Sequence, residues 1–303
     1  MKKINHIKHS NIDFEKWDKT VLSSEFPLVF AQSFYLNATS PNWNALIIND
    51  YESIFPLTIK SKFGFNYLPQ PPFTSQLGMY GKVNNEIEKM FYDYIKLNFK
   101  LIEIELNASN KLITENTFTK KTFVINYNNK FEYNQNTKRN IKKAIDNKFK
   151  VEFVAEEDYL QLSKQIINPF LINEIRLPQS TIKIFNDLIY NSIKNKKLIV
   201  FKTIDSNRDI KAIAYFIYNE KHALYLKGVS INKTENNGSM HLLLDYAVNY
   251  FKERVQFFDF GGGSLNLNLA QFYSGFGATE LNYNFLKIND LPIFINWIKK
   301  IRF

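Results

Sequence analysis

Apolar and polar residues alternate most regularly in the second half of the chain. Three strand-like runs, joined by the short polar loops DSNRD and NEK, cover Lys197–Ile204, Ile210–Tyr218 and His222–Val229. Such runs with short polar connections are typical of an antiparallel meander. The elements predicted next are a helix over Ser239–Phe251, a strand over Val255–Phe260, a helix over Asn268–Phe276, a strand over Thr279–Leu286 and a helix over Leu291–Ile301. The predicted order is therefore β-β-β-α-β-α-β.

The apolar helix over Ser239–Phe251 separates the meander from the strand over Val255–Phe260. Two neighbouring parallel strands need a crossover connection that covers the sheet. We therefore expect the meander to lie beside Val255–Phe260, with this helix crossing between them.

The first part of the chain mixes strands and a helix. Two runs around Asp50–Glu52 predict a hairpin, and Pro56 in its second run favours an edge or a bulge there. Pro69, Pro71 and Pro72 predict a rigid extended loop. The further predicted elements are strands over Asn44–Asn49, Ser53–Ile59, Leu101–Leu106 and Thr122–Tyr127 and an amphipathic helix over Glu86–Asn98.

A basic helix follows near residue 138, with Asn136 or Thr137 as its predicted cap. Its positive side chains include Lys138, Arg139, Lys142 and Lys143. They can bind nucleic acid, or they can belong to an ordinary solvated helix. A short strand over Val151–Val154 and helices over Tyr159–Phe170 and Gln179–Ile193 are predicted after it, separated near Pro169 and Pro178.

The chain length suits two domains. At roughly 100–200 residues per domain, the 303 residues divide into an N-terminal domain over 1–130 and a C-terminal domain over 131–303. We expect an α/β (α+β) fold in which mixed central sheets are flanked by helices.

Composition narrows the chemistry. The net charge of +10 favours polyanionic partners such as RNA, phosphorylated cofactors or an acidic membrane face. The sequence is also rich in Asn, Lys and Ile, as are proteins of AT-rich bacterial genomes, and compositional drift is an alternative source of part of the positive charge. The absence of cysteine excludes disulfides, thiolate metal sites and cysteine nucleophiles. The four histidines lack metal-ligand spacing, and we expect no metal and no permanently bound cofactor. With neither a signal peptide nor an apolar run of about 18 residues, a cytoplasmic location is expected.

Three short motifs accompany the predicted order of elements. They are Thr137–Ala144 (TKRNIKKA), Asn237–Ser239 (NGS) before an apolar helix, and Phe258–Gly262 (FDFGG) followed by Leu269–Ala278 (LAQFYSGFGA). In this order and spacing the chain resembles the GNAT superfamily, and within it the bacterial Fem-type peptidyltransferases. The resemblance covers most of residues 137–290 and, more loosely, the first domain.

The resemblance implies two tandem GNAT-like domains, with the acceptor on the N-terminal side and the donor on the C-terminal side. It implies an acyltransferase that moves an acyl or aminoacyl group onto an amine of a small molecule or peptide. The GNAT signature (Gln/Arg)-x-x-Gly-x-(Gly/Ala) is absent, because the corresponding loop has only Gly238. Aminoacyl-tRNA, as Fem enzymes use, and acyl-CoA both remain candidate donors. Residues 155–195 are too short and too rich in proline for the tRNA-clamping arm of that family.

Candidate donor-binding residues lie after two strands. A helix N-terminus with unpaired N–H groups is a natural phosphate site, and the predicted site here is Asn237, Gly238, Ser239 and Met240. A plain helix cap is the alternative. The run Gly261, Gly262 and Gly263 directly follows a predicted buried strand, where close approach of a ligand would explain three glycines.

The candidate catalytic groups are Asp259, Lys227 and Tyr273. Asp259 alternates with Phe258 and Phe260, and is either a tuned base or hydrogen-bonded structure. Lys227, expected to share a face with Tyr225, could bind phosphate or polarise a carbonyl, and Tyr273 could donate a proton.

A predicted acceptor groove uses Tyr67, Gln70 and Phe73 around the proline-rich loop, with ordinary packing as the alternative. Two other functions stay open at this point. One is a CoA-dependent N-acetyltransferase, and the other is a catalytically inactive GNAT-like module that binds RNA or protein. The sequence leaves the oligomeric state open.

Overall fold

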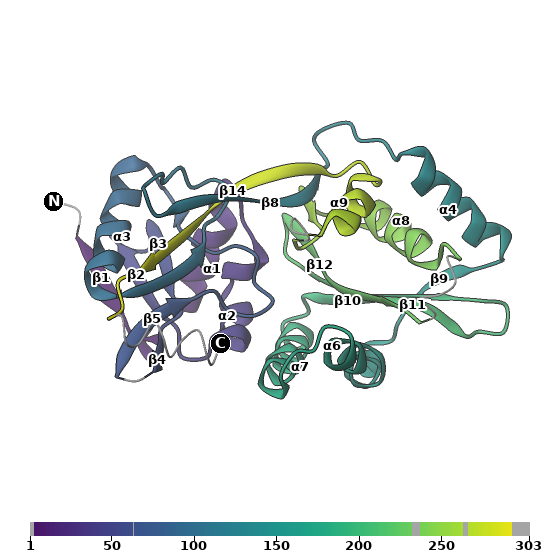
Figure 1. Ribbon diagram of the computed structural model, residues 1–303, viewed down its shortest axis with the longest axis horizontal. Helices are drawn as coiled ribbons and strands as arrows, with labels where there is room; N and C mark the ends of the chain where they lie inside the picture. The colour runs from purple at the N-terminus through teal and green to yellow at the C-terminus, as the bar shows by residue number, and fades with distance from the viewer. Residues whose placement is uncertain (1–2, 63, 232–236, 263–265, 293–303) are drawn as a thin grey trace. The chain divides into compact units, whose positions relative to one another are not determined.

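The computed structural model describes residues 3–62, 64–231, 237–262 and 266–292. The chain forms two compact units, one of residues 1–120 with the chain from Asn282 onward and one of residues 121–281 (Figure 1). It passes into the second unit within β8 (Thr117–Asn126) and returns within β14 (Thr279–Asn289). The structure thus draws the boundary differently from a single division at residue 130, because the end of β14 pairs with a strand of the first unit.

The first unit contains the predicted hairpin. Strands β2 (Asn44–Ile48) and β3 (Ser53–Leu57) pair antiparallel within the order β1-β2-β3-β6, where β1 is Ile4–Ile7 and β6 is Tyr80–Gly81. Strand β6 pairs with β3 only at Ser53 and Ile54. Pro56 therefore lies where β3 has a single partner, as its missing N–H requires.

Further strands of this unit surround β7 (Leu101–Glu105). It pairs in parallel with β5 (Phe65–Pro69), which also pairs with β4 (Lys60–Lys62), and antiparallel with β14 from Phe285 to Asn289. The helix α3 (Asn85–Asn98) matches its prediction within one residue.

Two helices of the first unit, α1 (Phe14–Ser23) and α2 (Ser33–Thr39), were not predicted. The side chain of Asp13 caps α1 by accepting from the Lys16 N–H. Trp17 of α1 packs on Trp43, with ring centroids 4.5 Å apart, and both are fully buried. Single-turn 3₁₀ segments at His9–Asn11 and Val29–Ala31 complete this region.

The second unit contains the predicted meander. Strands β9 (Lys150–Phe153), β10 (Leu198–Ile204), β11 (Ile210–Tyr218) and β12 (His222–Ser230) pair antiparallel in sequence. Strand β13 (Phe257–Asp259) pairs in parallel with β12 and antiparallel with β8. The helix α8 (Ser239–Phe251) makes the crossover, so the predicted arrangement is confirmed.

Helices cover both faces of this sheet. In Figure 1, α8 lies on one face, while α6 (Asn168–Asn173) and α7 (Gln179–Lys194) lie on the opposite face. Pro169 does not end a helix, because α5 (Tyr159–Leu162) continues through a π-helical turn (Ser163–Ile167) into α6, and a 3₁₀ turn (Glu156–Asp158) precedes it. The basic helix is α4 (Gln135–Asp146), capped by Asn134 rather than by Asn136 or Thr137.

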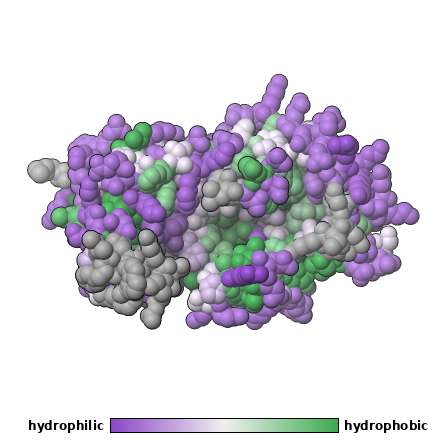
Figure 2. Space-filling model, viewed as in Figure 1, coloured by the Kyte–Doolittle hydropathy of each residue, from purple (hydrophilic) through white to green (hydrophobic). Residues whose placement is uncertain are grey.

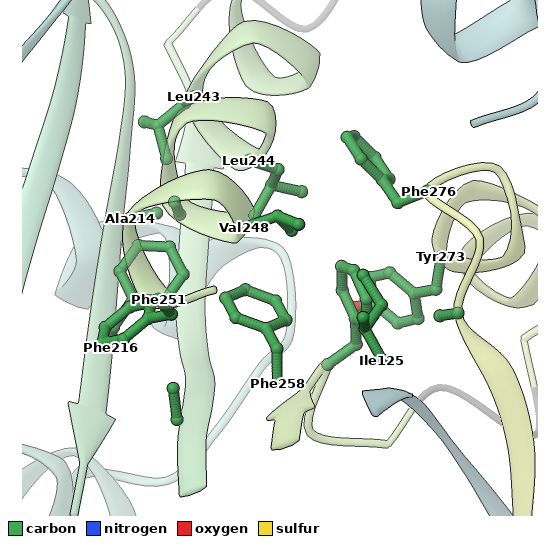
Figure 3. Packing of buried hydrophobic residues seen from close by; sticks show 14 of the residues in the cluster. Ile125, Ala214, Phe216, Leu243, Leu244, Val248, Phe251, Phe258, Tyr273 and Phe276 are labelled. Carbon is green, nitrogen blue, oxygen red and sulfur yellow. The ribbon is translucent and has the colours of Figure 1, made fainter. Parts of the chain in front are cut away.

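The core of the second unit is aromatic and lies between α8, α9 (Leu267–Ser274) and the sheet. Leu244 and Val248 of α8 pack with Phe216 of β11, Phe258 of β13 and Phe276 after α9 (Figure 3). This packing accounts for part of the aromatic richness of the sequence.

Two findings concern absences within the described ranges. No helix there is long and apolar enough to cross a membrane. No group of three or more His, Asp or Glu side chains there is placed to hold a metal ion. The predicted helix over Leu291–Ile301 lies, apart from its first two residues, outside the described ranges.

Candidate functional site

The parallel strands β12 and β13 pair over only three residues. The register runs from His222 opposite Phe257 to Leu224 opposite Asp259, whereas β12 continues to Ser230. Parallel strands in one sheet normally stay about 4.8 Å apart along their shared length. Beyond Leu224, β12 continues beside β11, whereas its described ladder with β13 ends because β13 itself ends at Asp259. This end of the shared ladder is the separation of β12 and β13.

A β-bulge at Leu226 changes which way the side chains of β12 point. Tyr215 lies opposite Lys227 and Phe216 opposite Tyr225, so Leu226 is the extra residue. Tyr225 consequently faces the α8 core with Phe216. Lys227 lies over the ring of Phe170 of α6 on the other face, 4.6 Å from its centroid. The expectation that Tyr225 and Lys227 share a face was wrong, because the bulge inverts the alternation.

Asp259 ends β13 in a buried hydrogen-bond network. Its Oδ1 accepts from the Thr122 hydroxyl at 3.0 Å and from the Gly261 N–H at 2.8 Å. The Thr122 hydroxyl in turn accepts from the Gly262 N–H at 3.2 Å. The other oxygen, Oδ2, lies 3.4 Å from His222 Nε2, and neither side chain is exposed to solvent. Asp259 thereby fixes the chain at the point where β12 and β13 separate.

Aromatic side chains line this region on the α8 side. The ring of Tyr273, from α9, stacks on Phe260 with centroids 4.7 Å apart and lies 6.4 Å from Tyr225. The Tyr225 hydroxyl lies 3.7 Å from the sulfur of Met240, at the start of α8. Gly228 leaves room for the Tyr225 ring, since a β-carbon there would come within 2.2 Å of the Tyr225 hydroxyl.

Both phenols keep their protons at neutral pH. Burial raises the pKa of Tyr225 well above its ordinary value. Burial, with the nearby negative charge of Asp259, raises the pKa of Tyr273 to about 12. A buried protonated phenol can donate a hydrogen bond to a developing oxyanion, but it is a poor general base.

The predicted phosphate site at the start of α8 is filled largely by the protein itself. Gly238 has φ 77°, and a β-carbon on it would lie 2.1 Å from the Asn140 carbonyl oxygen of α4. The Asn237 side chain accepts from the Ser239 N–H, and Ser239 is buried. Packing therefore accounts for Gly238 without a ligand, and phosphate binding at residues 237–240 stays a prediction.

The glycines after β13 have different surroundings. Gly261 has φ 75°, and a β-carbon there would lie 2.9 Å from the Tyr225 carbonyl oxygen, so its small size permits close approach to β12. Gly262 has φ 116° and donates to Thr122. Gly263 lies outside the described residues. Both described glycines thus lie at the separation of β12 and β13, as a ligand site there would need.

Of the predicted catalytic groups, the structure brings together Asp259 and Tyr273, whereas Lys227 lies on the other face of the sheet. Reasoning from sequence missed His222 and Thr122, because their partners lie in distant segments. It also missed His241 in the first turn of α8, whose ring lies 4.9 Å from that of Phe272. Burial lowers the pKa of His241 to about 4, so the imidazole is neutral at pH 7.

The motifs on α4 and around α9 pack against one another. Ala144 of α4 is buried beside Gly238, and Gly275 would place a β-carbon 2.5 Å from the Thr137 hydroxyl. The opposite side of α4 is exposed and basic, and the visible face of the second unit around it is mainly hydrophilic in Figure 2. Its exposed positive side chains include Lys138, Arg139, Lys142 and Lys143.

The predicted acceptor residues lie in the first unit. Gln70 is structural in part, since its amide oxygen accepts from the Glu105 N–H and its amide nitrogen donates to the Thr74 carbonyl, both at 3.0 Å. The Phe73 carbonyl accepts from the Tyr35 hydroxyl. Tyr67 is partly exposed, and its pKa is raised by burial and by the Glu103 charge. An acceptor role for these three residues stays a prediction.

No protein-family description matches this sequence, and no curated protein matches it. Solved structures do share its fold. A FemX crystal structure matches with a TM-score of 0.68 over 96% of this chain and 99% of its own, at 11% identity. The C-terminal domain of a putative lysylphosphatidylglycerol synthetase from Agrobacterium fabrum matches with a TM-score of 0.58 over 95% of each chain, at 9% identity.

A GNAT-family acetyltransferase from Colwellia psychrerythraea matches with a TM-score of 0.53 over 95% of this chain and 100% of its own, at 11% identity. Identities this low show the fold alone. The chain therefore has a GNAT-like fold of the Fem type, a mixed α/β architecture of two tandem domains.

Proposed function

We propose that the protein transfers an acyl or aminoacyl group from an activated donor to an amine. The observation that carries this proposal is the separation of β12 and β13 after Leu224, beside the protonated phenols of Tyr225 and Tyr273. An extended donor can lie along β12 past the end of its ladder with β13, and the phenols can donate hydrogen bonds to the carbonyl at its end.

The reaction requires no covalent enzyme intermediate. The neutral amine attacks the donor carbonyl, a C–N bond forms, and the C–O or C–S bond to the carrier breaks. A hydrogen bond from Tyr225 or Tyr273 stabilises the oxyanion, and the proton lost by the amine is transferred to the leaving oxygen or sulfur. Asp259 acts as a positioning residue, because its carboxylate holds Gly261 and Thr122 rather than facing solvent.

Aminoacyl-tRNA is the donor we favour over acyl-CoA. At the start of α8, Gly238 packs against Asn140, and the Ser239 N–H already donates to the Asn237 side chain, so that N–H is not open to a pyrophosphate. The exposed positive side chains of α4 offer an alternative place for phosphates. A polynucleotide matches an extended row of charges better than a single cofactor does.

The test is a transfer assay with two donors. The protein is incubated with aminoacyl-tRNA, or with acyl-CoA, and a mixture of primary amines, and amide products are identified by mass spectrometry. We expect amide formation with aminoacyl-tRNA. The Tyr273→Phe variant should lose roughly 10²-fold in rate, as loss of a proton donor or oxyanion donor typically costs, with tRNA affinity unchanged.

Tyr246→Phe is the matched control, since Tyr246 lies on α8 but packs on Phe201, away from β13. It should leave the rate unchanged. Transfer from acyl-CoA but not from aminoacyl-tRNA would show that acyl-CoA is the donor. No transfer from either donor would favour an inactive binding module.

A further inference from the structure

A cavity of about 640 Å³ lies in the second unit, between the segment of residues 127–133 and α8. This cavity is a different site from the end of the β12–β13 ladder, because its lining comes from the loop after β8, from the start of α4 and from the last turns of α8. Part of its wall is aromatic. The partly buried rings of Tyr127, Phe131 and Tyr133 follow one another, with centroids 6.0 Å and 6.2 Å apart.

The carboxylate of Asp245 lies beside these rings. Tyr133 is hydrogen-bonded to it, and Asn249 donates to its Oδ1 at 2.9 Å. A carboxylate has about four acceptor positions, so Asp245 can still accept from a ligand N–H. The Tyr127 hydroxyl is engaged with the Val248 carbonyl at 2.7 Å, which fixes this part of the wall.

The cavity carries charges of both signs. Asp245 is partly buried, whereas Lys130, Lys138 and Lys252 and the carboxylate of Glu132 line the same cavity from exposed positions. A simple cation would be repelled by the three lysines, and a simple anion by the two carboxylates. A ligand with a flat, amino-bearing ring at one end and a phosphate at the other fits both.

We propose that this cavity binds one nucleotide of a single-stranded RNA. The base stacks on Phe131 or Tyr133, its exocyclic amino group donates to Asp245, and its phosphates contact the lysines. Stacking on aromatic rings beside a positively charged surface is how single strands are commonly bound. Lys138 belongs to both the cavity and α4, so the strand can continue along the basic face of that helix.

Only the identification of the RNA as donor rests on the proposed function. The preferred bases are those with an exocyclic amino group, namely adenine, cytosine and guanine. Uracil has none, and it should bind more weakly because Asp245 would face a carbonyl oxygen instead.

The test measures binding of two fluorescent hexanucleotides, one of adenosine and cytidine and one of uridine, at fixed low salt. We expect the first to bind at least about fivefold more tightly to the wild type. Phe131→Ala should weaken its binding roughly tenfold, as loss of one stacking contact does. Asp245→Asn should reduce the preference over uridine, because a neutral amide is a weaker acceptor.

A paired control is Lys142→Gln, on α4 but outside the lining of the cavity. It should weaken both oligonucleotides alike and keep the preference. Far-ultraviolet circular dichroism checks that each variant folds. If AMP and CMP bind with the same base preference while the hexanucleotides do not, the cavity takes a free nucleotide.

Equal binding of both hexanucleotides by the wild type, or full binding by folded Phe131→Ala, would overturn the proposal. The transfer assay separates this inference from the proposed function. Base-selective binding without transfer would contradict the function alone, and transfer without base-selective binding would contradict the cavity assignment alone.

Discussion

The carbonyl oxygen of Asn140 lies directly against the α-carbon of Gly238. A β-carbon at that position would be 2.1 Å from the oxygen, with the β-carbon of Ala144 at 3.3 Å. Two of the motifs by which the chain resembles Fem-type proteins are thus in contact, one on α4 and one at the start of α8. Both motifs therefore serve the packing of these helices, whatever ligand binds nearby.

Substitution of Gly238 should therefore destabilise the fold. Gly238→Ala adds a β-carbon both at positive φ and against a backbone atom, and we expect a loss of about 2–4 kcal/mol in the free energy of unfolding. Gly64→Ala is the control, since Gly64 has φ 78° with nothing within 4 Å of its β-carbon position. It should cost only about 1–2 kcal/mol. Urea denaturation measures both, and equal losses would show that the Asn140 contact is unimportant.

Asp259 and His222 should be energetically coupled. Asp259→Ala leaves the buried Thr122 hydroxyl and the Gly261 N–H without their acceptor, which should cost about 1–3 kcal/mol for each donor. A double-mutant cycle with His222→Ala should give a coupling of about 1 kcal/mol or more. The exposed pair Lys89–Asp93 serves as reference and should give about 0.5 kcal/mol or less. A catalytic base would behave differently: Asp259→Asn would keep full stability and lose transfer.

His241 should make stability fall in acid. Its pKa is about 4 in the folded protein and 6.5 in the unfolded chain, so protonation favours unfolding. The free energy of unfolding is unaffected by this histidine above pH 6.5, and it falls progressively as the pH drops to about 4. Between pH 7 and pH 4, the free energy of unfolding should fall by about 1–2 kcal/mol less in His241→Gln than in the wild type; this range allows for the partial exposure of His241. Urea denaturation at each pH measures the free energy of unfolding of both proteins. The same dependence on pH in His241→Gln and in the wild type would contradict this prediction.

The basic face of α4 should control salt dependence of RNA binding. Each phosphate contact contributes roughly 0.7–0.9 to the slope of log affinity against log salt. Changing four side chains to Gln should flatten that slope by about 2.8–3.6 and weaken all sequences alike. The four are Lys138, Arg139, Lys142 and Lys143.

A control with the same change of charge uses four exposed lysines in the region of α5–α7, on the other face of the sheet: Lys164, Lys183, Lys194 and Lys196. It should leave the slope nearly unchanged. Equal flattening by both sets would mean that net charge, and not α4, attracts the RNA.

The sequence by itself determined the local elements and their order. The bounds predicted for α8 and β11 agree with the structure, Ser239–Phe251 and Ile210–Tyr218. Their hydrophobic periodicity is a local property, set by which face of the helix or strand is buried. The meander and its parallel neighbour followed from this order, because a helical crossover between strands permits few arrangements.

Only the tertiary structure decided which side chains meet. The return of β14 to the first unit, the bulge at Leu226 and the contact of Gly238 with Asn140 each depend on a partner far away in the chain. So does the pair formed by His222 and Asp259, which are adjacent because β12 and β13 lie side by side. Periodicity carries no information on register between distant strands, and a single extra residue inverts every later side chain. For that reason the sequence could name Asp259, Tyr273 and Lys227 as candidates, but only the fold could separate Lys227 from the other two.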